Sequence, residues 1–239
     1  MENYIDLVFY FAIYSFMGWV METIYASIAA GKFVNRGFLR GFFCPIYGFG
    51  AILIIAATGW AKSFLSGNIV SLLVGLLLSI LLVTILEYAT GLILEKIFKI
   101  KWWDYSNEYG NIHGYICIKN SLLWGGLAFL LVHVMHPLTV ELVYRIPALV
   151  KGYLGVFLIL FFTADTIASV IDTIGLRKVV LGFSNLPIDK YKVKIIQYKR
   201  LFQAFPHLLI LNAGIVNRDV RSILNDGFDK IVHEIKNRL

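Results

Sequence analysis

The chain has 239 residues, of which 59% are hydrophobic and 15% charged, and its formal net charge is +7. A soluble domain carries about 25% charged residues, so this composition excludes an ordinary water-soluble fold. Two cysteines are too few for a disulfide framework. The basic excess lies beside apolar blocks, which argues against nucleic acid as a partner.

Five apolar blocks occur along the chain, and each is long enough to cross a bilayer as a helix, which takes about 20 residues. A helix satisfies its own backbone hydrogen bonds in lipid. The sequence therefore predicts an all-α, polytopic transmembrane helix bundle. The predicted spans are residues 5–29, 43–61, 69–94, 122–144 and 152–174. The first should be a retained span, because Glu2 and Asp6 stand where a signal peptide would be basic.

Lys and Arg are concentrated in alternate connections. The first and third connections, together with the tail after Ile174, hold 19 of the 22 basic residues. Cytoplasmic loops carry such an excess, and an odd number of spans puts all three segments on one side. We therefore predict an N-terminus outside and a C-terminus inside, with a transmembrane domain over residues 1–176 and a basic, helical cytoplasmic tail over 177–239. Within this tail, apolar residues from Val220 to Leu239 recur at the spacing of an amphipathic helix.

Three acidic residues fall in the inner halves of the first, third and fifth predicted spans: Glu22, Glu87 and Asp165. A carboxylate at such a depth costs about 2.5–3.5 kcal/mol on insertion scales and usually faces a partner or a watery cavity. Their matched depth predicts a common polar pocket open to the cytoplasmic face. Two alternatives stay open: Glu87 could pair with Lys96 or Lys99, and Asp165 could be a neutral, hydrogen-bonded packing residue.

The first inner connection, between about residues 30 and 48, is rich in glycine and aromatic residues, which predicts a structured loop that includes Asn35. Arg36 offers a planar guanidinium that can pair with the membrane carboxylates or bind an anionic ligand, and its place among glycines favours the ligand role. Arg40 could instead be an ordinary basic residue beside anionic lipid. Pro45 is expected in the first turn of the second span.

The third inner connection, residues 95–121, is similarly dense in polar and aromatic residues. Trp102 and Trp103 could anchor the chain at the membrane interface. Asp104 and His113 could form a proton-handling pair, since histidine titrates near neutrality. They could equally cap helices and close the loop.

The sequence predicts no metal and no cofactor. His133 and His136 stand three residues apart without a nearby carboxylate, and Pro137 predicts a kink at this point. The chain has no phosphate-binding loop of the Gly-x-x-x-x-Gly-Lys-Ser/Thr kind. It is therefore not expected to be an ATPase itself.

Several motifs, taken as a set, resemble one bacterial family. The motifs are Tyr14-Ser-x-x-Gly-Trp-x-x-Glu22, Asn35-Arg-Gly-Phe-Leu39, Cys44-Pro-Ile-Tyr-Gly48, Glu87-Tyr-x-Thr-Gly91, Trp103-Asp-Tyr-Ser106 and Asn111-Ile-x-Gly114. They are similar to those of the ABC-transporter type IV (CmpB-like) permeases over about residues 5–125. The resemblance implies a multi-pass protein of the bacterial inner membrane with a transport role and a cytoplasmic ATPase partner. It carries no agreed catalytic residues.

Two functions stay open. A permease-like transport component would bind its substrate through polar residues of the inner side: Glu22, Asn35, Arg36, Glu87, Asp104, His113 and Asp165. A membrane-embedded enzyme would use the same face on a lipid-linked or head-group substrate at the inner leaflet. Plain outer connections favour the enzyme, whereas the resemblance and the lack of a catalytic triad favour transport, which we take as the leading hypothesis. Membrane lipids and an ATPase subunit are the expected partners, and a homo-oligomer stays open.

Overall fold

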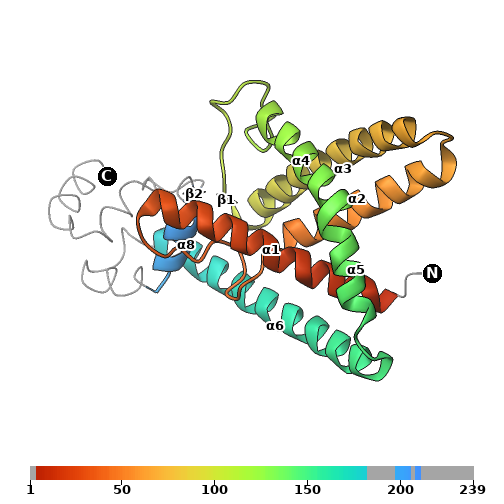
Figure 1. The fold of residues 1–239 in the computed structure, drawn as a ribbon. Helices are drawn as coiled ribbons and strands as arrows, with labels where there is room; N and C mark the ends of the chain where they lie inside the picture. The colour runs from red at the N-terminus through yellow and green to blue at the C-terminus, as the bar shows by residue number, and fades with distance from the viewer. Residues whose placement is uncertain (1–3, 182–196, 206–207, 211–239) are drawn as a thin grey trace.

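The computed structural model describes residues 4–181, 197–205 and 208–210 and is predominantly helical (Figure 1). In chain order its elements are α1 (Tyr4–Ala30), α2 (Pro45–Phe64), α3 (Asn68–Phe98), β1 (Ile100–Lys101), α4 (Ile118–Leu130), the π-helix η1 (Leu131–Met135), α5 (His136–Tyr144), α6 (Ala148–Leu181), α8 (Lys199–Ala204) and β2 (Leu209–Ile210). Five helical segments are long and apolar enough to span a membrane, with α4, η1 and α5 together forming the fourth. The predicted five-span, all-α fold is confirmed, and the spans begin and end a few residues from the predicted positions.

Helices that follow one another in the chain also pack together. α1 packs on α2, α2 on α3 and α3 on α4, while α5 and α6 both contact α1. The long connections 31–44 and 99–117 meet α8 and β2 at one end of the bundle, which we call the loop end (Figure 1). The short turns 65–67 and 145–147 lie toward the opposite end, with the start of α1.

Small residues allow close helix contacts. A Cβ atom at Gly18 of α1 would lie 2.2 Å from Cγ of Tyr47 on α2, and one at Gly75 of α3 would lie 3.2 Å from Cα of Thr58 on α2. Such close approach is typical of membrane bundles, where packing rather than the hydrophobic effect holds helices together. The Tyr47 ring consequently lies directly against the backbone of α1.

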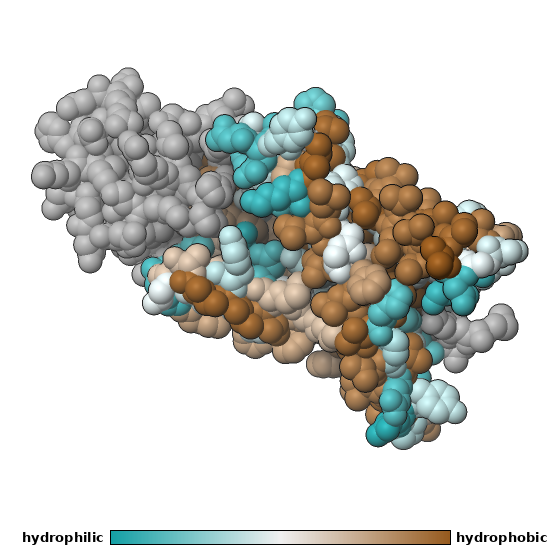
Figure 2. All heavy atoms as spheres, turned by 45° about the horizontal axis from the view of Figure 1, so that its top comes forward, coloured by the Kyte–Doolittle hydropathy of each residue, from teal (hydrophilic) through white to brown (hydrophobic). Residues whose placement is uncertain are grey.

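Large apolar side chains cover the outside of the bundle. On α3, for example, Leu73, Leu77, Leu81 and Ile85 recur every four residues, and each is more than half exposed. Figure 2 shows broad hydrophobic areas over the helices. Such a surface suits contact with lipid, where apolar residues over the span length are required.

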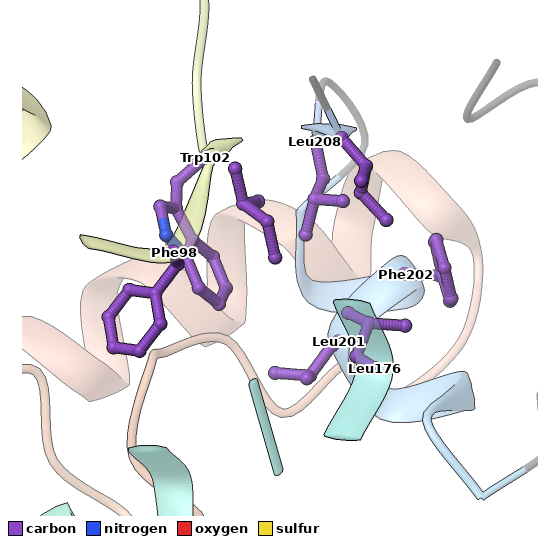
Figure 3. Packing of buried hydrophobic residues seen from close by; sticks show 8 residues of the cluster. Phe98, Trp102, Leu176, Leu201, Phe202 and Leu208 are labelled. Carbon is purple, nitrogen blue, oxygen red and sulfur yellow. The ribbon is translucent and has the colours of Figure 1, made fainter. Parts of the chain in front are cut away.

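A hydrophobic core lies at the loop end, and we call it the loop-end core (Figure 3). Its buried members are Phe98, Ile100, Trp102, Leu176, Leu201, Phe202, Leu208 and Ile210. The strand β1 pairs antiparallel with β2, with Ile100 opposite Ile210. The described tail elements α8 and β2 therefore pack against the ends of α3 and α6. Because Trp102 is 3% exposed, it belongs to this core rather than acting as the interfacial anchor considered from the sequence.

The fourth span is not a uniform α-helix. Residues Leu131–Met135 form the π-helix η1, and α5 starts immediately afterwards with Pro137 in its first turn. A π-helical turn accommodates one residue more than an α-helical turn and often occurs at functional sites. The irregularity predicted from Pro137 is therefore a π-helical segment that ends just before the proline.

The tail begins differently from the prediction. α6 continues to Leu181, so the first residues assigned to the tail extend the last membrane helix. α8 and β2 are the described elements beyond it. The amphipathic helix expected from Val220 to Leu239 lies outside the described residues.

Candidate functional site

Glu22 of α1 is held by two partners from neighbouring segments. The Tyr47 hydroxyl donates a 2.7 Å hydrogen bond to Glu22 Oε1, and Arg36 Nε lies 3.1 Å from Glu22 Oε2. Tyr47 can reach the carboxylate because Gly18, one turn earlier on α1, leaves room for its ring. The loop and α2 therefore neutralise and orient the same carboxylate.

Glu87 of α3 lies buried on the other side of Tyr47, with 6% of its surface exposed. The indole N–H of Trp124 donates a 3.1 Å hydrogen bond to Glu87 Oε2. The rings of Trp124 and Tyr47 are also in contact, with centroids 5.2 Å apart. Two aromatic side chains thus connect the carboxylates of α1 and α3.

Tyr105, in connection 99–117, is the third aromatic residue at this place. Burial raises the pKa of its phenol, and the charges of Glu87 and Glu22 raise this pKa further, while Arg36 lowers it. The phenol therefore stays protonated near neutral pH and can act as a hydrogen-bond donor. We call the following six side chains the polar cluster: Glu22, Arg36, Tyr47, Glu87, Tyr105 and Trp124.

The charges in the polar cluster do not balance. Glu22 is paired with Arg36, whereas no Lys or Arg of the described residues lies within ion-pair distance of Glu87. The pairing of Glu87 with Lys96 or Lys99, which the sequence left open, is therefore not formed. A buried carboxylate without a cationic partner is strongly disfavoured as an anion. The cluster can thus accept one positive charge, either as a proton or as part of a ligand.

Asn35 fixes the loop that delivers Arg36. Its side-chain oxygen accepts a 2.7 Å hydrogen bond from Trp19 Nε1, and its side-chain nitrogen donates to the carbonyl of Arg40 at 3.2 Å. The backbone N–H of Arg36 donates to Thr23 Oγ1 at 3.3 Å. These bonds hold the connection against α1, where the guanidinium of Arg36 reaches Glu22.

Cys44 ends the same loop in a buried position. Its backbone N–H donates a 2.9 Å hydrogen bond to the carbonyl of Ser15. Burial raises the pKa of the Cys44 thiol to about 12, with a further contribution from the charge of Glu22. The thiol is therefore protonated near neutral pH and a poor nucleophile.

Asp165 of α6 has a different set of partners. Its two carboxylate oxygens accept 3.0 Å hydrogen bonds from the backbone N–H groups of Arg40 and Gly41, and Ser169 Oγ also accepts from Arg40 N at 3.1 Å. The Arg40 guanidinium forms two hydrogen bonds, of 2.7 and 2.6 Å, with Asp172, which raises the pKa of Arg40. No contact links Asp165 to Glu22 or Glu87 in the described residues. Asp165 instead holds the first connection against α6 through these hydrogen bonds.

Replacing Asp165 should destabilise the contact between the first connection and α6. Asp165→Ala leaves the backbone N–H of Gly41 without its acceptor and the N–H of Arg40 with Ser169 Oγ alone, which should lower the free energy of unfolding by about 1–3 kcal/mol. Asp165→Asn keeps one acceptor oxygen and should cost less than Asp165→Ala. Thermal unfolding in detergent measures both, and equal losses for the two variants would contradict the hydrogen-bond role.

Asp104 and His113 lie in connection 99–117 and are joined through Lys101. The ammonium of Lys101 lies 2.9 Å from Asp104 Oδ1 and donates to the backbone carbonyl of His113 at 3.1 Å. Asp104 also accepts hydrogen bonds from the backbone and hydroxyl of Ser106, and the His113 ring contacts the hydroxyl of Tyr88 at 3.1 Å. Burial, the largest single effect, raises the pKa of Asp104, but hydrogen bonds with Ser106 and Lys101 and the charge of Lys101 together lower this pKa below its ordinary value. These contacts agree with the loop-closing alternative.

Of the seven residues proposed from the sequence, the structure brings Glu22, Arg36 and Glu87 into the polar cluster and places Asn35 directly beside it. The aromatic members of the cluster were not predicted. Tyr47 and Tyr105 do stand in two of the motifs that carry the family resemblance, which was a usable signal. Trp124 has no such signal, because a tryptophan in an apolar span is ordinarily a packing residue.

The chain matches the model of a known protein family. The model of the family described as "Putative ABC-transporter type IV" covers residues 9–170. The chain belongs to this family. No curated protein and no solved structure matches the chain.

The type IV ABC-transporter family model includes α1 to most of α6 and therefore every residue of the polar cluster. It ends before α8 and β2, so the elements that form the loop-end core with α3 and α6 lie beyond the match. Membership of this family and five membrane-spanning helices together fit a membrane transport component.

Proposed function

We propose that this chain is the membrane component of a transport system and that the polar cluster is its substrate-binding site. The observation that carries the proposal is the position of Glu22, Arg36 and Glu87, which meet between α1, α2, α3 and α4 near the loop end. Ionisable residues within membrane helices are costly and usually line the path of a substrate or ion. Asn35 and Asp165 position the loop, and Asp104 and His113 shape the connection that carries Tyr105.

The loop end faces the cytoplasm in this proposal, so that the site opens inward. Support comes from the sequence, since 19 of the 22 basic residues belong to the first connection, the third connection and the segment after Ile174, and cytoplasmic segments carry such an excess. A cytoplasmic ATPase subunit would then meet the connections and the tail. Family membership supports this partner.

The substrate is proposed to carry a positively charged group. Glu22 already has Arg36 as its counter-ion, whereas Glu87 has Trp124 as a hydrogen-bond donor and no cationic partner among the described residues. The rings of Tyr47 and Trp124 border the same place, and aromatic faces attract cations. An amine or quaternary ammonium group fits this combination better than an anion.

Polar residues of α1 outside the polar cluster favour transport over an enzyme that acts on lipid head groups. An enzyme at one leaflet needs polar residues at one depth only, whereas a transporter needs polar access from both sides. Beyond the polar cluster, α1 carries Tyr14, which is hydrogen-bonded to His136, and, in its first turn, Asp6, which is paired with Lys151. Asp104 and His113, the acid–base pair an enzyme would need, are engaged with Lys101 and Tyr88.

Native mass spectrometry of the purified protein tests the site. We expect a small cationic molecule to copurify with the wild type and to be lost in Glu87→Gln, because the amide keeps the shape and the hydrogen bond but removes the charge. Glu141→Gln is the matched control, since Glu141 lies in an exposed ion pair with Arg145 on α5. If Glu87→Gln retains the same bound molecule in the same amount as Glu141→Gln, the proposed site is wrong.

A further inference from the structure

A groove runs along one face of α4, and we call it the α4 groove. Its apolar lining includes Leu122, Leu123 and Leu130, which are all exposed. Its volume of about 760 Å³ lies within the range of about 300–1,000 Å³ that is usual for ligand sites. The opposite face of α4 is buried in the bundle, where Trp124 bonds Glu87. The α4 groove therefore lies on the other side of this helix from the polar cluster.

Gly126 leaves a gap in the middle of the grooved face. It stands four residues after Leu122 and four before Leu130, so the three residues form one row along the helix. A Cβ atom at Gly126 would meet nothing within 4 Å beyond its own turn of the helix. Glycines in membrane helices usually serve close helix contacts, and this one makes no such contact in the part of the chain that the structure describes. The gap leaves room for an apolar chain.

Connection 99–117 borders the groove where α4 begins (Figure 1). The side chain of Asn111 donates a 3.0 Å hydrogen bond to the carbonyl of Glu108 and closes a turn. Gly110, with a φ of 64°, lies against Ile118 at the start of α4, because a Cβ atom at Gly110 would be 2.4 Å from Cδ1 of Ile118. These contacts hold the turn at the end of the α4 groove and place Glu108 in its lining.

Two opposite charges, Glu108 and Lys119, line this end of the groove. Both residues are exposed, and among the described residues neither forms an ion pair, with the other or with a third group. Tyr109 beside them is 87% exposed, as is common for tyrosine at a membrane surface. Apolar residues then continue to Leu130, about 18 Å from the start of α4 at 1.5 Å per residue. The groove thus offers a carboxylate and an ammonium at one end and an apolar surface below them.

We propose that the α4 groove binds a phospholipid whose head group carries a primary amine, of the phosphatidylethanolamine type. Lys119 contacts the phosphate, Glu108 accepts hydrogen bonds from the head-group ammonium, and one acyl chain lies along α4 over Gly126. An anionic head group without an amine is repelled by the Glu108 carboxylate. The quaternary ammonium of phosphatidylcholine has no N–H to donate. The charge pair therefore selects the head group, whereas the apolar lining accepts any acyl chain.

The bound lipid lies against elements that also carry part of the polar cluster. α4 bears Trp124 on its buried face, and connection 99–117 bears Tyr105 as well as Glu108. The lipid site shares no residue with the polar cluster, so it does not depend on the substrate proposed above.

Competition between lipids with identical acyl chains tests the head-group preference. Delipidated full-length protein in detergent is mixed with equal amounts of dioleoyl phosphatidylethanolamine, phosphatidylcholine and phosphatidylglycerol, and native mass spectrometry measures which lipids stay bound. We expect the wild type to bind phosphatidylethanolamine about tenfold more tightly than the other two, close to the low end for a hydrogen bond to a charged group. Glu108→Gln should abolish this preference, and Glu108→Lys should replace it by a preference for phosphatidylglycerol, a gain that misfolding cannot produce.

Gly126→Leu tests the apolar part of the site, because a leucine side chain fills the gap. It should weaken binding of all three lipids by about tenfold, the loss expected when about two methylene groups leave the groove. Gly59→Leu is the matched control, since Gly59 of α2 is also exposed and a Cβ atom there likewise meets nothing within 4 Å. Thermal unfolding shows that each variant is folded.

Glu87→Gln separates this site from the proposed substrate site and should bind the three lipids as the wild type does. Equal binding of the three lipids by the wild type, or an unchanged preference in Glu108→Gln, would overturn the proposal. Equal binding by Gly126→Leu and Gly59→Leu would do the same. A dimer that carries no lipid would show instead that a second copy of the chain occupies the groove.

Discussion

Arg36→Ala is expected to lower the free energy of unfolding by about 3 kcal/mol, at the low end of the cost of breaking a buried ion pair. The loss follows because the Glu22 carboxylate, which lies in a span, loses its counter-ion, 3.1 Å away. The low end applies because the two side chains are 25% and 29% exposed. Adding Glu22→Gln should restore most of the lost stability, because the unpaired charge is then removed.

The measurement is thermal unfolding in detergent for the wild type, both single variants and the double variant. Arg145→Ala is the matched control, since the pair of Arg145 with Glu141 is more than half exposed on both sides and should contribute less than about 0.5 kcal/mol. If the double variant is no more stable than Arg36→Ala, the arginine does not act as the counter-ion of Glu22.

The same set of variants addresses the ligand role predicted for Arg36 from the sequence. Arg36→Lys preserves the charge but not the planar, bidentate fork. If the arginine serves only Glu22, this variant should stay nearly as stable as the wild type and retain any copurified molecule. Loss of that molecule from a stable Arg36→Lys protein would show that the guanidinium also contacts the ligand.

Phe202→Ala is expected to cost about 3–5 kcal/mol, the usual range for truncating a buried phenylalanine. Phe202 has no exposed surface and lies in the loop-end core with Leu176 of α6 and Trp102 (Figure 3). Removing its ring leaves a cavity between α8 and the end of α6. The segment 199–210 should therefore lose its contact with the bundle while the spans stay folded.

Hydrogen–deuterium exchange measures this local effect. Peptides that cover residues 199–210 and β1 should exchange faster in Phe202→Ala, and peptides from α1 and α2 should exchange as in the wild type. Phe33→Ala is the control at the same end of the bundle, because Phe33 is 69% exposed and should change neither region. Unchanged exchange in 199–210 would mean that the loop-end core does not hold the tail.

The number and approximate limits of the spans followed from the sequence because they depend on composition averaged over about 20 residues. The depth of a residue in the membrane also followed from its position within a predicted span, which is why Glu22 and Glu87 were expected at a similar depth. Depth does not say which helices are neighbours or toward which neighbour a side chain points. Asp165 was therefore assigned to the same pocket from its depth alone, whereas its carboxylate accepts hydrogen bonds from the backbone of the first connection.

Contacts between distant segments were out of reach from the sequence. Arg200 was counted only as part of a basic tail, yet its guanidinium donates to the backbone carbonyls of Gly37, Phe38 and Leu39. The pairing of β1 with β2 involves two residues on each side, which is too short to produce an alternating pattern. Polar contacts such as Tyr14 with His136 join residues 122 positions apart and leave no periodic trace.

The first connection contacts both the polar cluster and the tail, so binding events at these two places are linked energetically. Arg36 of this connection holds Glu22, and its guanidinium also lies over the ring of Phe205, 5.6 Å from the centroid, while Arg200 caps three carbonyls of the same connection. Coupling between two binding events on one segment is reciprocal. If packing of the tail segment 199–205 at the loop end strengthens ligand binding beside Arg36 by some free energy, then a bound ligand strengthens the packing of this segment by the same amount.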